Sequence, residues 1–303
     1  MAGADEFYCG FTPYNWLTLN KNVIPLNRRE NILGFNITSF ASMEILAKYV
    51  EKYKVPISIT LNSHYYHSKD YDFLEKYLRQ LIAIGFDRFI LADIALAYYI
   101  RESGIPCRLT LSGDAMMLNQ DTMTFLKQFD LERIIFPRMY TIADMEDCIK
   151  GNNQYSYEAF ILNSFCYYDS MMCNSLHCDE FCTSCMIPYN IKKKSYDVDK
   201  YLNRYYQFLI TNKMRKEYVL TGKNENLGAS GCGLCKIKGM QAARVDYFKI
   251  VGRGFKRSRI IRDIKVIREI GEAAMKMEND FFEDWVRNKF YPNGCPPFCY
   301  FPR

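Results

Sequence analysis

The most regular feature of the chain is a short apolar or β-branched run that returns after each amphipathic stretch. Eight of these runs predict strands, and they read EFYCGF (6–11), NILGFNI (31–37), PISITLN (56–62), DRFILAD (87–93), CRLTLSG (107–113), ERIIFPR (132–138), YEAFILN (157–163) and DYFKIVG (246–252). Runs of roughly four to eight such residues, bounded by turn residues, are typical of strands buried in a sheet.

The stretches between these runs have the spacing of helices. In the first of them, Met43, Leu46 and Val50 recur at intervals of three and four residues. Later helical stretches reach Gly85 and Gly104, and glycine is a common left-handed stop after a helix. Strands that alternate with helices in this way pair in parallel through right-handed crossovers.

Eight strand–helix units predict an α/β fold of the (β/α)8 TIM-like barrel type. An open doubly wound sheet is the alternative, but no glycine-rich phosphate-binding turn follows the first predicted strand. A long loop covers 11–30, and a cysteine-rich insertion, 164–235, follows the seventh strand. We therefore expect a barrel over 1–257, insertion included, and a C-terminal part over 258–303.

The C-terminal part begins with a long amphipathic stretch and ends in a tail that contains cysteines. We predict one long helix whose apolar face is made of Ile260, Ile264, Ile267, Ala274, Met277, Phe281 and Trp285. This helix is expected to pack against the barrel.

Composition limits the compartment more than the function. The chain has 303 residues, of which 49% are apolar and 24% charged, with a net charge of +6. No apolar run approaches the roughly 18 residues that a membrane-spanning helix needs. The first ten residues contain two acidic side chains and no apolar signal region. These features predict a cytoplasmic protein without a membrane span.

Twelve cysteines are many for a protein in a compartment where disulfides are rare. Clustered thiols in such a protein indicate a metal site. One group follows the seventh predicted strand and a second precedes the eighth: Cys166, Cys173, Cys178, Cys182, Cys185, Cys232 and Cys235. In a barrel, these two parts of the chain can meet at one site.

Three interpretations of these thiols compete. Zinc favours regular CxxC pairs, which CTSC and CGLC supply. A redox dithiol needs one such pair and leaves the other cysteines unexplained. An iron–sulfur cluster tolerates less regular spacings and also accommodates Cys166 and Cys173. Cys295 and Cys299 in the tail either contribute to a second metal site or lie inert at the surface.

Two segments bring a family resemblance into view. ARVDYFKIVGRGFKRS, starting at residue 243, resembles the AGVDSFKIEGRMKS signature of peptidase family U32, the collagenase-like family. The C-x6-C of Cys166 and Cys173, after YEAFILNSF, is similar to the family's E-L-F-V-H-G-x-x-C segment. The resemblance is strongest over about residues 155–260. One departure is Val251, where the family signature has a glutamate.

The resemblance implies a barrel fold and a specific chemistry. Several family members hold a 4Fe-4S cluster on four cysteines and act as oxygen-independent hydroxylases on a quinone precursor or on RNA nucleobases, some with prephenate as the oxygen donor. By this resemblance, the cluster ligands would be Cys166 and Cys173, then Cys182 or Cys185, and finally Cys232 or Cys235. A partner subunit of the same family is a further possibility.

Polar residues gather at the predicted carboxyl ends of the strands, where barrel active sites lie. They are Asn62, His64, Asp93, Ser112, Asp114, Arg138, Asn163 and Arg253. We predict His64 as a general acid or base. Arg138 and Arg253 are predicted to hold a carboxylate or phosphate. With Asp93 they form the predicted catalytic set, and Asn62 and Asn163 are predicted to bind substrate.

Aromatic residues beside His64 point to a flat substrate. Tyr65 and Tyr66 could stack on a nucleobase or another planar ring. An RNA base is favoured by the positive charge and by the basic runs IKKK and RGFKRSR. A small aromatic compound is the alternative substrate.

Together, these patterns predict a 4Fe-4S barrel enzyme that hydroxylates, or modifies in a related way, a planar ring. A U32-type protease is one alternative, although the chain contains neither HExxH nor GxSxG and only three histidines. The other alternative is a non-catalytic barrel stapled by zinc that binds a partner.

Overall fold

A computed structural model describes residues 2–20, 25–28, 35–166 and 226–301. The strands are β1 (Phe7–Phe11), β2 (Asn36–Ile37), β3 (Ile57–Leu61), β4 (Arg88–Leu91), β5 (Arg108–Leu111), β6 (Leu131–Ile135), β7 (Ser156–Leu162) and β8 (Tyr247–Ile250). The helices are α1 (Tyr14–Asn20), α2 (Phe40–Tyr53), α3 (Tyr71–Ala83), α4 (Ile94–Glu102), α5 (Gln120–Leu126), α6 (Ile142–Ile149), α8 (Ile237–Ala242), α9 (Arg257–Lys276) and α10 (Asn279–Phe290). Short 3-10 turns cover Ser68–Asp70, Lys127–Phe129 and Leu234–Lys236.

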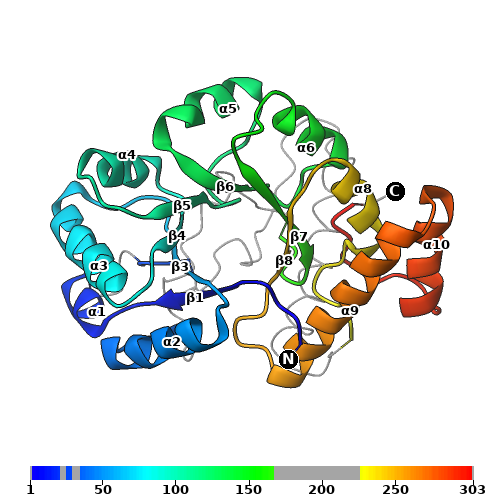
Figure 1. Cartoon of the computed structure of the whole chain (residues 1–303), viewed down its shortest axis with the longest axis horizontal. Coiled ribbons are helices and arrows are strands. Elements are labelled where there is room, and N and C mark those ends of the chain that lie inside the picture. Colours follow the sequence, from blue (N-terminus) through cyan, green and yellow to red (C-terminus); the bar gives the residue numbers. More distant parts are fainter. Residues whose placement is uncertain (1, 21–24, 29–34, 167–225, 302–303) are drawn as a thin grey trace, which may run out of the picture.

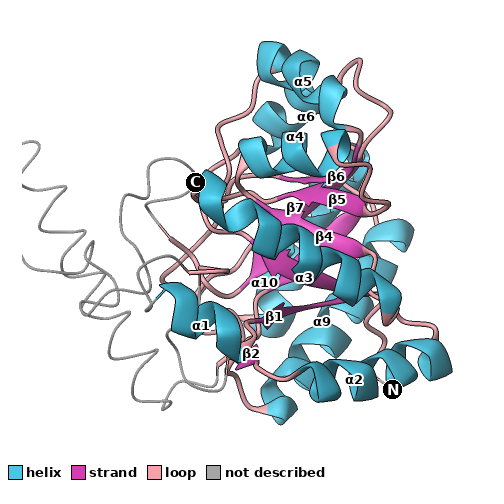
Figure 2. Ribbon diagram, turned by 90° about the vertical axis from the view of Figure 1, so that its left-hand side faces the viewer, coloured by secondary structure: helices cyan, strands magenta, loops and turns pink. Residues whose placement is uncertain are grey.

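All eight strands belong to one parallel sheet in the order β2-β1-β3-β4-β5-β6-β7-β8. The sheet curls around a central region, and the helices lie outside it (Figure 1). The view from the side shows these helices flanking the strands (Figure 2). The predicted α/β, TIM-like architecture is thereby confirmed, and the carboxyl ends of the strands share one face.

The structure corrects the predicted closure of the barrel. The second predicted strand was expected between the first and the third, but β1 pairs directly with β3, and the two-residue β2 lies on the other edge of β1. A Cβ atom at Gly10 would collide with the side chain of Asn36, so glycine is what permits this approach. Within the described part of the chain no strand joins β8 to β1 or β2, and the sheet stays open there.

Local signals explain where the helices begin and end. The Asn119 side chain accepts a hydrogen bond from the amide of Thr122, and Thr141 and Asp144 form a reciprocal capping box. The predicted glycine stops are confirmed, since Gly85 and Gly104 both have positive φ angles.

The interior contains one large apolar core and a smaller cluster at the carboxyl ends of the strands. The smaller cluster is made of Ile90, Ile135, Phe160, Phe165, Val251, Phe298 and Tyr300. We call it the mouth cluster. Two of its members, Phe298 and Tyr300, come from the C-terminal tail, which therefore packs against the carboxyl ends of the strands. Val251 is buried here, so the position that carries glutamate in the U32 signature is apolar in this chain.

The predicted long C-terminal helix is two helices. The chain is extended at Met277, between α9 and α10, and this break shifts the phase of the apolar face. Phe281, predicted to be buried, is 68% exposed, whereas its neighbour Phe282 is buried. Across the described ranges, no helix is both long and apolar enough to span a membrane. Residues 167–225, most of the predicted cysteine-rich insertion, lie outside the described residues.

Candidate functional site

A small pocket of about 90 Å³ opens at the carboxyl ends of the strands. We call it the mouth pocket. The described residues that line it come from seven strands or the loops that follow them, and they include Tyr8, Arg28, Asn62, Ser112, Asp114, Arg138, Phe160, Cys166, Lys249 and Arg253. Several residues predicted from distant parts of the sequence therefore meet in one place. A pocket of this size admits a compact ligand or one group of a larger ligand.

Two arginines of the pocket share one carboxylate. Arg138 Nη1 lies 3.0 Å from Asp114 Oδ1, and Arg28 Nε lies 3.6 Å from Asp114 Oδ2. All three side chains are at most 15% exposed, so this ion triad is screened only weakly by solvent. The guanidinium of Arg138 also stacks on the ring of Phe160, 3.9 Å from its centroid. The triad fixes both arginines at the wall of the pocket.

Arg253 adds a third guanidinium to the same wall. Its Nη1 donates to Asn27 Oδ1 at 3.1 Å, and no carboxylate among the described residues lies within salt-bridge distance. Burial lowers the pKa of Arg253 from its ordinary value, although the group remains charged at neutral pH. Three guanidinium groups against one carboxylate make the described lining of the pocket cationic.

His64 lies at the edge of this arrangement in contact with the Arg28 guanidinium. Burial, and then the Arg28 charge, lower the pKa of His64 to about 4. The imidazole is therefore neutral at neutral pH. It can accept a proton at its free ring nitrogen, whereas the imidazolium that would serve as a general acid is not populated, so the predicted role narrows to that of a base.

Three residues predicted for catalysis or substrate binding are not among the residues that line the pocket. Asp93 caps α4, accepting from the Ala95 amide at 2.8 Å, and also accepts from the Tyr66 amide at 2.9 Å. Tyr66 itself is buried, and its hydroxyl donates to the Leu26 carbonyl at 2.6 Å. Tyr65 is half exposed. Asn62, in contrast, does line the pocket.

Asn163 also has a structural position. It is fully buried with a left-handed backbone, and its amide donates to Asp263 Oδ2 at 2.9 Å. Its side-chain oxygen accepts from Arg259 Nη2 at 2.8 Å, and its carbonyl accepts from the Tyr300 hydroxyl. This asparagine joins the end of β7 to α9 and the tail.

The two cysteine-bearing segments predicted to meet do run side by side. Leu162 at the end of β7 forms an antiparallel bridge with Cys232, and the Phe165 amide donates to the Ser230 carbonyl at 2.7 Å. Cys166 follows immediately and lines the mouth pocket. Cys173, Cys182 and Cys185 lie outside the described residues.

Cys232 and Cys235 lie near α10 and the C-terminal tail. The backbone of Cys232 forms an isolated parallel β-bridge with that of Cys299, and both thiols are free. The Cys232 Sγ lies 3.1 Å from the Tyr291 hydroxyl. Burial raises the pKa of the Cys232 thiol to about 12 and also raises that of Cys235. A metal would therefore have to displace their protons on binding. Cys295 is exposed.

Thiolates are the donors that iron–sulfur clusters and structural zinc require, and here one thiol-bearing segment reaches the pocket at Cys166 while the second runs beside it. The cysteine sulfur atoms of these segments are therefore ligands of the right kind for either metal centre. The described thiols do not complete one by themselves, because no three His, Cys, Asp or Glu side chains within 2–20, 25–28, 35–166 and 226–301 are arranged to hold a metal ion.

Sequence reasoning missed several residues of the pocket, among them Tyr8, Arg28 and Phe160. Tyr8 lies inside a predicted strand, so no terminal signal marked it. Arg28 belongs to the long loop that follows β1, and the unusual length of that loop was the available signal. Phe160 reads as an ordinary core residue, and only the curvature of the sheet turns it toward the pocket.

Fold and site together define a parallel α/β barrel-like protein with a cationic, cysteine-bearing pocket at the carboxyl ends of its strands. The sequence profile of Peptidase family U32 matches residues 1–292, and the chain belongs to this family. A solved structure described as that of a U32 peptidase is similar at 10% identity and a TM-score of 0.40, covering 56% of this chain and 74% of that one. No curated protein matches the chain in sequence.

Proposed function

We propose that this U32 protein is an oxygen-independent hydroxylase, or a closely related modifying enzyme, that acts on a planar ring at the mouth pocket. The observation that carries the proposal is the position of Cys166, which shares the pocket with Arg28, Arg138 and Arg253. A thiol at that place can hold a metal centre at the point where three cations can hold an anionic reactant.

The thiols proposed to hold a 4Fe-4S cluster are Cys166 and Cys173, one of Cys182 and Cys185, and one of Cys232 and Cys235. Such a cluster supplies electron transfer or activates an oxygen-bearing group when it is bound. The protein's own side chains do the remaining work, which is binding, orientation and proton transfer.

The arginines of the mouth pocket are proposed to bind an anionic oxygen donor. Arg138 and Arg253 project into one small cavity, and each presents a planar fork that matches a carboxylate. A dicarboxylate such as prephenate would satisfy both. His64, neutral and beside Arg28, is placed to accept a proton from the reacting ring or from water.

The substrate is proposed to be a planar ring, either an RNA base or a small aromatic compound. Tyr8 and Phe160 supply aromatic surface in the pocket wall. The small size of the pocket favours a single ring that enters alone, so a nucleobase would have to leave its stack before it could react.

The metal proposal is tested by purification without oxygen, followed by iron and sulfide analysis and an absorbance spectrum. We expect iron and sulfide in equal amounts and a broad band at about 400 nm from thiolate-to-iron charge transfer. Cys166→Ser should lose iron, whereas Cys107→Ser, at the far end of β5, should retain it. A colourless protein that holds only zinc, or equal iron in both variants, would contradict the proposal.

The anion site is tested by equilibrium binding of prephenate to the purified full chain. Arg138→Gln and Arg253→Gln should each weaken binding at least about tenfold, the loss expected for a charge-assisted hydrogen bond. Arg88→Gln is the matched control, because it removes the same charge at the amino end of β4, where Arg88 pairs with Glu132. Equal loss in all three variants would point to nonspecific attraction and contradict the site.

A further inference from the structure

A second and much larger cavity, of about 860 Å³, opens on the side of the molecule where the sheet is not closed. Its walls are the N-terminal segment 3–8, the strand β8 and the helix α9. We call it the side cavity. Its volume lies within the range of about 300–1,000 Å³ that is usual for small-molecule sites.

The side cavity exists because β1 and β8 do not pair. All four residues of β8 are only partly buried, whereas β3 to β7 are buried along most of their length. Tyr8 reaches across the gap, with its hydroxyl 3.4 Å from the Ile250 carbonyl. The opening between the two edges leads to the charged interior of the sheet.

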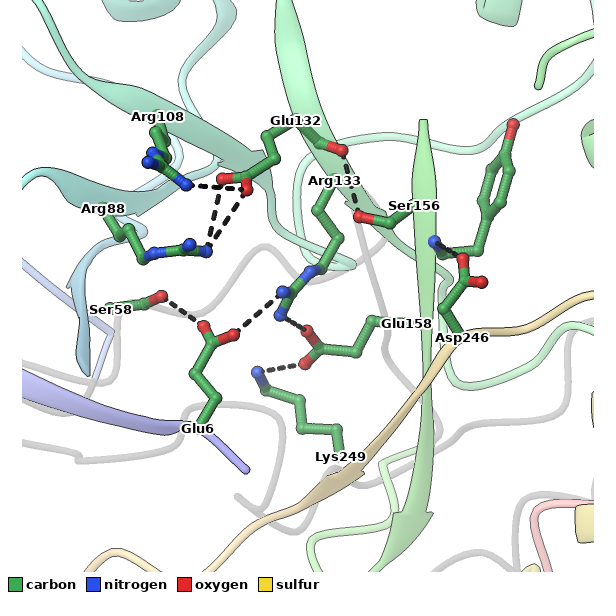
Figure 3. Close-up of polar contacts among 11 residues, drawn as sticks. Glu6, Ser58, Arg88, Arg108, Glu132, Arg133, Ser156, Glu158, Asp246 and Lys249 are labelled. Atoms are coloured by element: carbon green, nitrogen blue, oxygen red, sulfur yellow. Dashed lines mark hydrogen bonds and ion pairs between the residues drawn. The ribbon is translucent and has the colours of Figure 1, made fainter. Parts of the chain in front are cut away.

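The floor of the side cavity is a network of paired charges from the inner face of the sheet (Figure 3). Arg133 bonds Glu158 at 3.0 Å and Glu6 at 2.9 Å, and Lys249 bonds Glu158 at 2.6 Å. Tyr247 covers the guanidinium of Arg133 at 3.5 Å. Two cations and two carboxylates sum to zero, and each already has its partner.

The opposite wall comes from α9 and is apolar along one stretch, although Arg268 and Glu272 of the same helix also border the cavity. Ile260, Ile264 and Ile267 line it, and Gly271 continues the same helix face. A Cβ atom at Gly271 would meet nothing within 4 Å, so this glycine borders open space. It has a helical backbone, and therefore its lack of a side chain is not needed for the conformation.

We propose that the side cavity binds an uncharged, largely apolar small molecule whose single hydrogen-bonding end faces the floor. A charged ligand would find no uncompensated partner in the four-residue network and would lose its hydration on entry. Arg253, which has no carboxylate within salt-bridge distance among the described residues, borders the cavity only where it meets the mouth pocket. An apolar body is matched by the isoleucines of α9, and a polar end can bond to the carboxylate oxygens or the amine of the floor.

The side cavity lies next to the mouth pocket. Tyr8, Ile90, Lys249 and Arg253 line both, so these four side chains form the partition between them. A molecule in the side cavity would therefore contact Tyr8 and Arg253, which also line the mouth pocket. The site is nevertheless inferred from its own lining and stands whether or not the mouth pocket carries the proposed chemistry.

The test uses the neutral fluorescent probe N-phenyl-1-naphthylamine, titrated into the full-length protein. Gly271→Trp places a large side chain in the open space and should weaken probe binding at least about tenfold. Gly271→Ala is the matched control, because it raises helix propensity without filling the cavity, and should bind as the wild type does. Ile267→Trp, one turn earlier, provides a second filling variant if Gly271→Trp does not fold.

The charge of the ligand is tested with the anionic relative of the probe, anilinonaphthalene sulfonate. We expect it to bind at least about tenfold more weakly than the neutral probe, and to be insensitive to Gly271→Trp. Unchanged binding of the neutral probe to both folded tryptophan variants would overturn the site. Equal, cavity-dependent binding of the anionic probe would overturn the proposed neutrality of the ligand.

Discussion

Glu158 keeps its negative charge inside the sheet because two cations contact its two oxygens. Burial alone would raise the pKa of this carboxyl, but Lys249 and Arg133 together hold it below its ordinary value of 4.5. A buried charge of this kind is costly once its partners are lost, whereas a half-exposed pair contributes little. The charged network of the floor is therefore sensitive to single changes.

Glu158→Gln is expected to lower the free energy of unfolding by about 3–5 kcal/mol, because it leaves the buried Lys249 with a neutral partner and Arg133 with Glu6 as its remaining carboxylate. Glu132→Gln, whose partners Arg88 and Arg108 are partly exposed, should cost less than about 1 kcal/mol. Urea unfolding at neutral pH measures both. Equal losses would contradict the buried network.

The same substitution predicts a dependence on pH. A carboxyl whose folded pKa is depressed stabilises the fold fully above its ordinary value of 4.5 and loses that contribution as the pH falls below it. The stability difference between the wild type and Glu158→Gln should therefore be constant near neutrality and shrink below about pH 4.5. A difference that grows on acidification would exclude this account.

His64 changes stability in the same direction as Glu158 but over a higher pH range, since its folded pKa is about 4 against an ordinary 6.5. The unfolded chain takes up the proton first, so stability present above pH 6.5 falls as the pH drops toward 4. The slope can reach about 1.4 kcal/mol per pH unit. His64→Gln should remove this part of the slope in urea unfolding at successive pH values. An unchanged slope would place His64 in solvent.

At the scale of the single element, α4 begins at a polar residue that lies at a strand end and is also predicted to be catalytic. Asp93 stands where barrel enzymes place catalytic groups, and the sequence pattern alone gives it that role. In the structure its carboxylate is occupied by three backbone amides, at the start of α4 and at Tyr66. The two roles use the same residue type at the same position, and only the hydrogen bonds distinguish them.

Asp93→Ala is expected to destabilise the protein by about 1–3 kcal/mol, because a helix cap is lost and the buried Tyr66 amide loses its acceptor. Asp93→Asn keeps an acceptor oxygen and should retain most of the stability. Thermal unfolding of both variants measures the effect. Similar losses in the two would show that the charge, and not the capping oxygen, is what matters.

The elements were largely predictable, and so was the order of the strands apart from the place of β2. Apolar runs and glycine stops identify strands and helices because burial and backbone conformation are local properties. The placement of β2 outside β1 depends on a contact between Gly10 and Asn36, which no periodicity encodes. The break at Met277 was missed for a similar reason, since the apolar spacing continues through it with a change of phase.

For the molecule as a whole, the tail after α10 packs on the mouth cluster at the carboxyl ends of the strands. Phe298 and Tyr300 are almost fully buried in the mouth cluster against Phe165 and Phe160. The U32 profile ends at residue 292, so these contacts come from a part of the chain beyond the family match. The candidate site was predictable only in part, because the tail and the loop bearing Arg28 approach it from regions without a motif.

Phe298→Ala is expected to lower the free energy of unfolding by about 3–5 kcal/mol, as a large side chain is removed from a packed cluster. Asn293→Ala, exposed a few residues earlier, should change it by less than about 0.5 kcal/mol. Urea unfolding measures both variants. A loss below about 1 kcal/mol for Phe298→Ala would mean that the tail docks only loosely.

The docking of this tail also imposes an order of events during synthesis. A ribosome releases the chain from its N-terminus onward, so β1 to β8 are available to assemble before residues 298–300 emerge. During that interval the rings of Phe160 and Phe165 lack their partners Tyr300 and Phe298. The nascent barrel therefore exposes apolar surface that other molecules can bind. A newly made chain should accordingly be a better client for chaperones than the finished protein.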